Sequence, residues 1–284
     1  MKTGFIGLGT LGKTIAKRLV SRGVELMVWN RTRAKAVEFG APVAESPVKV
    51  LGEVDVVFLN LFDSKAVEEV IFGPGGFMEG DLSGKTIIDT TTNHFDRVAA
   101  FHQRVREKGG RYLEAPVLGS VVPASEGNLT VLVSGEKDAY EQQRPLIEII
   151  GKNIFYLPRP STATKMKLIN NLLLGTFMAA ISEAMVFGEA AGVDKEQVLD
   201  IFAAGAGNSG VLNAKRKKLL TGDFSPHFSS ALIYKDLHYL EDLARTLKRP
   251  LFTGSPVKEL FALTFKGGKD QLDFSVLYEV LKGL

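Results

Sequence analysis

The sequence predicts an α/β fold: a doubly wound parallel sheet at the N-terminus and an all-helical domain at the C-terminus, joined by one long interdomain helix. Three observations support this prediction. Short apolar runs alternate with segments of helical periodicity up to residue 156, and no strand-like run follows Ser161. Between these two regions lies a largely apolar stretch from Ser161 to Gly192, which predicts a helix of roughly 30 residues and about 45 Å.

The predicted strands of the first domain are short runs of aliphatic, β-branched and aromatic residues. They cover 3–6, 24–29, 54–59, 86–89, 111–114, 129–133 and 153–156. Helical periodicity, often followed by glycine, predicts helices at 13–22, 33–39, 64–72, 95–108 and 138–150. Because strands that alternate with helices run parallel, this order predicts a doubly wound sheet.

The long helix is bounded by residues that break or cap helices. The prolines of the linker 157–160 cannot lie inside a helix, Ser161 or Thr162 can cap one, and Gly192 can end one. Its second half is apolar nearly all round, so we expect it to be buried on several sides. Glu183 near its middle favours the core helix of a soluble protein over a membrane span.

The remaining helices of the second domain follow from periodicity alone. They are expected at 194–203, 211–220, 229–246, 255–266 and 274–282. The stiff linker before Ser161 then divides the chain into domains 1–160 and 161–284. The one basic run, Lys215 to Lys218, is interpreted as a solvated helix face.

Composition excludes several classes of function. The 35 Lys and Arg residues against 32 Asp and Glu give a net charge of +3, which is too near neutral to favour nucleic acid binding. With no cysteine and four scattered histidines, neither a thiol nucleophile nor a metal site is expected. The N-terminus enters a strand pattern without a signal-peptide pattern, so we expect a cytoplasmic protein with no membrane partner.

A glycine motif follows the first strand and opens the first helix. Its residues are Gly7, Leu8, Gly9, Thr10, Leu11 and Gly12. In this context G-x-G-x-x-G predicts a dinucleotide site in a Rossmann domain. Gly7 permits the tight turn, Gly9 lets the backbone approach the pyrophosphate, and Gly12 allows close packing of the helix.

The end of the second strand distinguishes the two nicotinamide cofactors. An acidic residue there would bind the ribose hydroxyls of NAD, whereas this chain has Asn30, Arg31 and Thr32, with Lys35 one turn later. A guanidinium, a hydroxyl and an ammonium suit the 2′-phosphate of NADP. We therefore predict NADP as the cofactor, with NAD less favoured.

Four segments of the chain form a recognisable set. They are the glycine turn, Glu114-Ala115-Pro116-Val117-Leu118-Gly119-Ser120, Lys167-Leu168-Ile169-Asn170-Asn171 and Lys235-Asp236-Leu237. Together they resemble the β-hydroxyacid dehydrogenases, which include 3-hydroxyisobutyrate dehydrogenases and glyoxylate and succinic semialdehyde reductases. The resemblance covers nearly the whole chain and keeps motif order and spacing. It implies reversible oxidation of a small carboxylate-bearing hydroxy acid by hydride exchange with the nicotinamide.

The resemblance also implies roles for single residues. Lys167 would be the general acid/base, held by the amide of Asn171, which lies one helical turn later on the same face. Leu118, Gly119 and Ser120 would bind the substrate carboxylate. On the helical domain, Phe228 would line the pocket and Asp236 would approach the active site. The further cofactor contacts implied are Asn60, Leu61, Phe62, Thr92 and Lys235.

The chain departs from the family pattern at several positions. Leu118 replaces a common serine, Ser161 and Ala163 replace two common glycines, and Leu11 replaces the usual methionine. The first change leaves the substrate open among succinic semialdehyde, glyoxylate, 3-hydroxyisobutyrate and serine.

Other readings of the resemblance remain. Imine reductases share the architecture but generally lack the lysine, and 6-phosphogluconate dehydrogenases need a longer helical domain. A non-catalytic NADP-binding or scaffold protein of the same fold is the third alternative. Because helical domains of this family pair through the long helix, we expect a homodimer or homotetramer.

Overall fold

The computed structural model describes residues 2–284. The chain divides into two compact units, Met1–Lys167 and Leu168–Leu284. This division lies inside the long helix, whereas the sequence analysis placed it at the linker before Ser161. The physical reason is that the first turn of the helix hydrogen-bonds to the first unit, through Ser161, Ala163 and Thr164.

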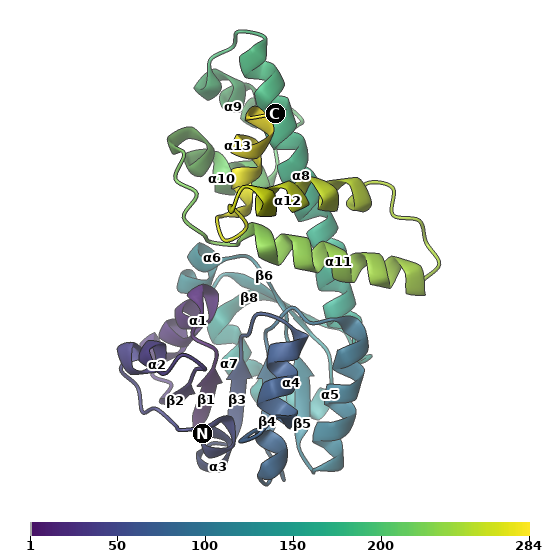
Figure 1. The fold of residues 1–284 in the computed structure, drawn as a ribbon. Coiled ribbons are helices and arrows are strands. Elements are labelled where there is room, and N and C mark those ends of the chain that lie inside the picture. Colours follow the sequence, from purple (N-terminus) through teal and green to yellow (C-terminus); the bar gives the residue numbers. More distant parts are fainter. Residues whose placement is uncertain (1) are drawn as a thin grey trace. The chain divides into compact units, whose positions relative to one another are not determined.

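The first unit is built on a five-stranded parallel sheet with strand order β2-β1-β3-β4-β5 (Figure 1). Its strands are β1 (Thr3–Ile6), β2 (Leu26–Trp29), β3 (Val56–Leu59), β4 (Thr86–Asp89) and β5 (Arg111–Glu114). The pairing is in phase, so the four residues of each strand lie opposite four of the next. The chain leaves β1 toward β2 on one side and continues to β3 on the other, which makes the ends of β1 and β3 the topological switch point.

Helices cover both faces of this sheet. One core gathers side chains of α1 (Thr10–Ser21), α2 (Arg33–Phe39) and α7 (Lys137–Ile150), and the other those of α3 (Pro47–Glu53), α4 (Ser64–Phe72) and α5 (Phe95–Glu107). Successive strand residues alternate between the cores: Phe5 and Phe58 face the first, Ile6 and Leu59 the second. A sheet buried on both faces explains why its strands are continuous apolar runs. The doubly wound α/β prediction is confirmed.

The last predicted strands form a separate sheet of the same unit, with order β6-β7-β8. It contains β6 (Val117–Leu118), β7 (Leu129–Val133) and β8 (Gly151–Tyr156), with β6 antiparallel and β8 parallel to β7. An isolated bridge between Glu114 and Ser134 links it to the end of β5. The strand β6 and three short helices, α3, η1 (Phe77–Glu79) and α6 (Val121–Glu126), were not predicted. Elements this short show at most two turns or one pair of alternating residues, so periodicity identifies them only irregularly.

The second unit is entirely helical, as predicted. Its elements, with α8 beginning in the first unit, are α8 (Thr162–Ala190), α9 (Lys195–Ala204), α10 (Gly210–Thr221), α11 (Ser230–Thr246), α12 (Gly254–Lys266), η2 (Phe274–Val276) and α13 (Leu277–Lys282). Side chains of Asp194, Ser209, Ser229 and Asp273 cap the elements that follow them. Sharp caps of this kind explain why the predicted bounds lie within a residue or two of the observed ones.

The long helix α8 is less buried than predicted. By length and composition it could cross a membrane, with a mean hydropathy of 1.4 over 18 residues, but core helices of soluble proteins pass the same test. Only 39% of that window is buried. Its exposed apolar side chains are Met166, Ile169, Leu173, Phe177 and Phe187. The expectation of burial on several sides is therefore wrong for the single chain, which leaves this stripe without cover.

The basic run on α10 is also not a solvated face. Lys215 and Lys218 are buried. Lys215 Nζ lies 2.8 Å from Asp273 Oδ2, and Lys218 Nζ donates to the carbonyl oxygens of Asp223 and Ser225. The prediction was wrong for these two residues because their partners lie in other segments of the helical unit.

Candidate functional site

The glycine turn after β1 is fixed by contacts that exclude any side chain at two of its positions. Gly7 has φ +100° and its N–H donates to the carbonyl of Trp29 (3.1 Å). A Cβ on Gly7 would lie 2.2 Å from the carbonyl oxygen of Asn60, and a Cβ on Gly12 would lie 2.0 Å from that of Gly7. These two glycines therefore let the turn, the first helix and the loop after β3 approach closely.

Gly9 is different, because the fold itself does not require a glycine there. It has ordinary extended dihedrals, φ −69° and ψ −175°, and among residues 2–284 no atom outside its chain neighbours lies within 4 Å of an added Cβ. It is the N-cap of α1, without a side-chain capping bond. An open space over a helix N-terminus fits a pyrophosphate, so the residues present fit a dinucleotide cofactor. Around it, Leu8 is buried, Leu11 half-buried and Thr10 exposed.

Replacing Gly9 by valine is expected to block cofactor binding without unfolding the protein. The side chain would occupy the open space, and losing two charge-assisted hydrogen bonds to phosphate would raise the Kd for NADPH by about 100-fold. The free energy of unfolding should fall by no more than about 1 kcal/mol. Calorimetric NADPH titration and urea unfolding measure both quantities. Gly12→Ala provides the contrast, since its Cβ clash predicts a large loss of stability; equal stability losses in the two variants would contradict this assignment.

Asn30 at the end of β2 braces the glycine turn. Its Oδ1 accepts the N–H of Leu8 (2.9 Å), and its Nδ2 donates to the carbonyl of Thr32 (2.9 Å). Both ends of the amide are thus used inside the protein. The side chains of Arg31, Thr32 and Lys35, by contrast, are exposed at the start of α2.

The surface at this edge is rich in cations. The hydrogen bond from Lys13 and its charge lower the pKa of Glu38, and the charges of Lys17 and Lys35 act in the same direction. Glu69 is an acidic neighbour of Arg31, whose Nη1 lies 3.9 Å from its Oε2, with both side chains largely exposed. Exposed pairs of this kind are weak. The edge is therefore suited to an anionic group beside the glycine turn.

The loops after β3 and β4 are bonded to each other near the same turn. Asn60 Nδ2 donates to Thr90 Oγ1 (2.9 Å), and the N–H of Leu61 donates to Thr91 Oγ1 (2.9 Å). Phe62 is exposed and Thr92 half-buried. The structure thus brings the predicted residues 60–62 beside the glycine turn at the carboxyl ends of the strands, where ligands of open α/β sheets bind.

The predicted substrate loop leaves the short strand β6. Leu118 is half-buried and pairs with Thr130 of β7. Gly119 has φ +116°, and a Cβ there would lie 2.9 Å from the side chain of Leu129. Ser120 follows with extended backbone at the N-terminus of α6. Glycine at 119 is thus required to turn the chain sharply between strand and helix.

Lys167 lies in the second turn of α8, buried, with 6% of its surface exposed. Lys165, two residues earlier, points around the helix to a different side and lies over the ring of Phe95, 5.6 Å from its centre. Burying an amine costs free energy that its partners must offset, so Lys167 is not an ordinary solvated lysine.

Asn171, one turn after Lys167, has a fully buried amide that is only half satisfied. Its Nδ2 donates to Asp236 Oδ2 (2.6 Å), whereas its Oδ1 has no hydrogen-bond partner among residues 2–284. Because a carboxylate only accepts, Asp236 fixes the orientation of the amide and leaves the carbonyl oxygen as the unused acceptor. Most buried acceptors in proteins are paired, so this oxygen is available to a donor from a ligand or another group.

The other predicted residues of the helical unit are Lys235, next to Asp236 on α11, and Phe228 in the loop before α11. Lys235 Nζ lies 2.8 Å from Asp236 Oδ1 and 4.8 Å from the ring centre of Tyr239. Phe228 packs edge to face on Phe274, with ring centres 5.7 Å apart. Lys235 is thus engaged with Asp236 in the helical unit, where the resemblance implied a cofactor contact.

The predicted residues are therefore distributed over the two units. The first holds the glycine turn, residues 30–35, 60–62, Thr92, the substrate loop and Lys167; the second holds Asn171, Phe228, Lys235 and Asp236.

Two buried carboxylates, Asp89 and Glu114, were not proposed as functional residues from the sequence. Asp89 and Glu114 end adjacent strands and pair in register. Asp89 accepts hydrogen bonds from Tyr112 and Asn93 side chains, and its burial raises its pKa despite these bonds. Burial and the charge of Asp89 in turn raise the pKa of Tyr112 well above 10. The available signal was an acidic residue at the last position of each of these two predicted strands.

Comparison with known families covers both units. Residues 2–157 match the family described as the NAD binding domain of 6-phosphogluconate dehydrogenase. Residues 161–281 match the NAD-binding domain of NADP-dependent 3-hydroxyisobutyrate dehydrogenase.

Individual relatives extend over nearly the whole chain. Glyoxylate/succinic semialdehyde reductase 1 of Arabidopsis thaliana is 33% identical over 99% of both chains. The 2-hydroxy-3-oxopropionate reductase of Escherichia coli K12 is 33% identical over 99% of this chain and 97% of its own. Human cytokine-like nuclear factor N-PAC is 32% identical, and the match spans 51% of its length.

A solved structure also resembles this chain over nearly its whole length. Psf3, in complex with NADP+ and 2-OPP, superposes with a TM-score of 0.90 at 28% identity, covering 98% of this chain and 99% of that one. Since relatives named as glyoxylate/succinic semialdehyde reductase and 2-hydroxy-3-oxopropionate reductase align with almost all of its length, the chain belongs to the β-hydroxyacid dehydrogenase family of NAD(P)-dependent oxidoreductases.

Proposed function

We propose that this protein is an NADP-dependent reductase or dehydrogenase of small β- or γ-hydroxy acids and their semialdehydes, with Lys167 as general acid/base. The main support is the position of two buried side chains on α8. Lys167 lies one turn before Asn171, whose amide oxygen has no hydrogen-bond partner among residues 2–284. An ammonium and an unused carbonyl acceptor on one helix face suit a substrate oxygen that gains and loses a proton.

The chain's own residues divide the chemistry between them. When bound, the nicotinamide supplies or accepts the hydride at the carbinol carbon. Lys167 Nζ gives a proton to the substrate oxygen during reduction and removes it during oxidation. The segment Leu118 to Ser120 binds the substrate carboxylate with backbone N–H groups and the serine hydroxyl. Asn171 Oδ1 accepts a hydrogen bond from the lysine or the substrate hydroxyl.

Among possible substrates, glyoxylate and succinic semialdehyde are favoured. The Asn30-Arg31-Thr32 element and the Gly119-Ser120 pair resemble the corresponding reductases, and one such reductase is 33% identical over 99% of the chain. Leu118, in place of a common serine, removes one hydroxyl from the loop and keeps 3-hydroxyisobutyrate and serine as candidates.

The preference for NADP rests on the exposed cations at the start of α2. Replacing Arg31 by alanine is expected to raise the Kd for NADPH by about 10- to 100-fold, because a guanidinium–phosphate hydrogen bond contributes roughly 1.5–3 kcal/mol. The Kd for NADH should change less than about twofold. Calorimetric titration with each cofactor measures both values. Arg22→Ala, an exposed arginine at the C-terminal end of α1, is the control; equal weakening of NADPH and NADH by Arg31→Ala would refute the assignment.

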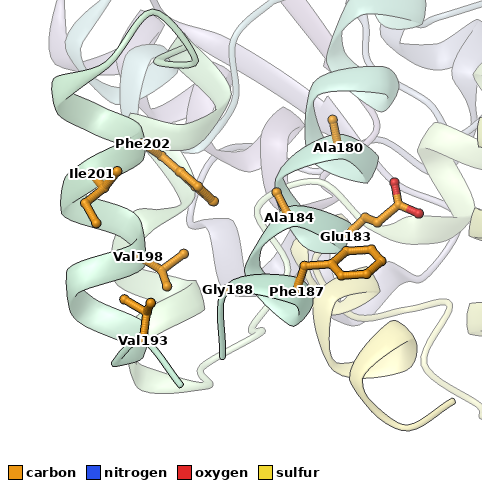
Figure 2. A pocket seen from close by; sticks show the side chains of 9 residues that line it. All are labelled: Ala180, Glu183, Ala184, Phe187, Gly188, Val193, Val198, Ile201 and Phe202. Carbon is orange, nitrogen blue, oxygen red and sulfur yellow. The ribbon is translucent and has the colours of Figure 1, made fainter. Parts of the chain in front are cut away.

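A second copy of the chain is proposed to cover the exposed stripe of α8. Besides the stripe, an open groove of about 500 Å³ lies between the end of α8 and α9. Figure 2 shows Phe187 and Glu183 on α8, with Val198, Ile201 and Phe202 across the groove on α9. Exposed aliphatic and aromatic side chains along one helix are typical of a subunit interface. Such pairing gives the expected homodimer or homotetramer.

A non-catalytic role is the second candidate, because N-PAC contains a similar region within a chain about twice as long. A cofactor-binding scaffold would bind NADP without turnover. An imine reductase of the same architecture would reduce a C=N bond and would not require Lys167.

Initial-rate kinetics test the proposal against both. NADPH oxidation would be followed with succinic semialdehyde and glyoxylate, NADP+ reduction with 3-hydroxyisobutyrate and serine, and each repeated with NAD(H). Turnover of one of these substrates with preference for the phosphorylated cofactor is the expected result. Tight NADP+ binding without turnover of any of them, or turnover only of a cyclic imine, would favour the alternatives.

A further inference from the structure

Glu114 places a buried carboxylate against the start of α8. It is the last residue of β5 and 1% exposed. One carboxylate oxygen, Oε1, accepts the N–H of Ser161, and the other, Oε2, accepts the N–H (2.9 Å) and hydroxyl (2.7 Å) of Thr164. His102 Nε2 lies 3.4 Å from Oε1 on the other side. Every partner belongs to the first unit, so this arrangement is internal to it.

These bonds satisfy the N–H groups that a helix cannot satisfy itself. The first turn of any helix has N–H donors without intrahelical acceptors, and a negative charge there is favourable. In α8 the donors of Ser161 and Thr164 go to Glu114, and that of Ala163 goes to Ser134 Oγ (2.9 Å). The entry of the helix is thus held by side chains from the sheets rather than by its own cap.

The backbone at this entry adopts a conformation that needs such support. Ser161 has φ +67°, in the left-handed region that residues with a Cβ rarely adopt. Its hydroxyl donates to the carbonyl of Phe95 (2.9 Å), while its N–H donates to Glu114. The bond from the Ser161 N–H to the Glu114 carboxylate therefore helps to hold a backbone conformation that is otherwise disfavoured.

Glu114 connects two parts of the proposed active site. Thr164 lies one turn before Lys167 on α8, and Glu114 lies four positions before Leu118 in the chain. The segment that leads into the substrate loop is thus hydrogen-bonded to the first turn of α8, the helix that carries Lys167. We propose that Glu114 is a positioning residue, which sets the place of Lys167 relative to the substrate loop by anchoring the first turn of α8. This inference rests on the proposed function, in which Lys167 transfers the proton.

Glu114→Gln in the full chain tests the anchor. Both carboxylate oxygens accept backbone N–H groups, so either orientation of the amide places an NH2 against an N–H donor. We expect amide exchange of the segment 161–167 to accelerate about tenfold and kcat to fall about 10- to 100-fold, the effect of a small misplacement of a catalytic group. The Kd for NADPH, bound at the glycine turn, should change less than about twofold. Glu114→Asp keeps the charge and should restore part of kcat.

Ile147→Ala serves as a matched control. It truncates a fully buried side chain of α7, which lowers stability while every residue bonded to Glu114 stays in place. We expect it to leave kcat and exchange at 161–167 unchanged. A kcat in Glu114→Gln within twofold of the wild type, or a lower kcat with unchanged exchange at 161–167, would overturn the proposal. If the wild type shows no turnover, the proposed function fails on its own, and hydrogen exchange still decides whether Glu114 anchors the helix.

Discussion

Replacing Lys167 by methionine is expected to lower kcat by about 10²- to 10⁴-fold, the usual contribution of a general acid/base. Methionine keeps the length and the burial of the side chain but cannot carry a proton. Because the glycine turn and the start of α2 are untouched, the Kd for NADPH should stay within about twofold of the wild type. Initial rates of NADPH oxidation at saturating substrate give kcat, and calorimetric titration gives the Kd for NADPH.

Lys165 offers the matched control for this substitution. It lies on the same turns of α8 but packs over Phe95 instead of facing the side of Lys167 and Asn171. Lys165→Met should therefore keep kcat within about twofold. Should Lys167→Met retain more than a tenth of the wild-type kcat, the lysine would not be the proton donor, and the imine reductase reading would gain support.

Elements with a strong local signal were predictable from sequence. The β1 strand, the glycine turn and α1 follow each other directly, and apolar runs such as 56–59 report burial on both sheet faces. Short segments were not predictable. The two residues of β6 form a strand only because Val117 and Leu118 pair with β7, which is a tertiary contact and leaves no trace in their own periodicity.

The site shows the same division between local and distant determinants. Lys167 and Asn171 could be paired because they are one turn apart on a helix. Glu114 is 50 positions from Thr164, so its role as a helix anchor is invisible in the local sequence. The helix entry also gives a physical reason for the glycine that the family resemblance implies at position 161: the backbone there is left-handed, and Ser161 adopts it with the help of two tertiary hydrogen bonds.

Loss of the Asp273 carboxylate is expected to produce the largest loss of stability in the helical unit. Asp273 is fully buried and its Oδ2 accepts from Lys215 Nζ (2.8 Å) and from the N–H groups of His227 (3.1 Å) and Phe228 (3.3 Å). Its Oδ1 accepts from the N–H and hydroxyl of Ser275. Asp273→Ala would leave the buried Lys215 without its counter-charge, at a cost of about 3–5 kcal/mol. Urea unfolding at pH 7 measures this change.

The pH dependence of the stability loss in Asp273→Ala identifies how much of it comes from the charge of the Asp273 carboxylate. Burial alone would raise the pKa of Asp273, but the charge of Lys215 and the hydrogen bonds from Lys215 and Ser275 outweigh it and lower the pKa. A carboxyl whose pKa is lower in the folded state stabilises the fold above its unfolded pKa of about 3.9, and this contribution is lost as the pH falls through the folded value. The difference in unfolding free energy between wild type and Asp273→Ala should therefore be largest near neutral pH and narrow progressively below about pH 4.

A double variant separates the ion pair from the loop contacts. Lys215→Met removes the buried ammonium that has lost its counter-charge in Asp273→Ala. The double variant should therefore be more stable than Asp273→Ala alone. The recovery should be incomplete, because the N–H groups of His227 and Phe228 still lack their acceptor. These bonds hold the loop that carries Phe228, which would line the substrate pocket. The KM for the substrate should therefore be raised in Asp273→Ala and stay raised in the double variant, although part of the stability is recovered. Strict additivity of the two substitutions would mean that the pair contributes nothing, and that the burial of Lys215 is balanced elsewhere in the helical unit.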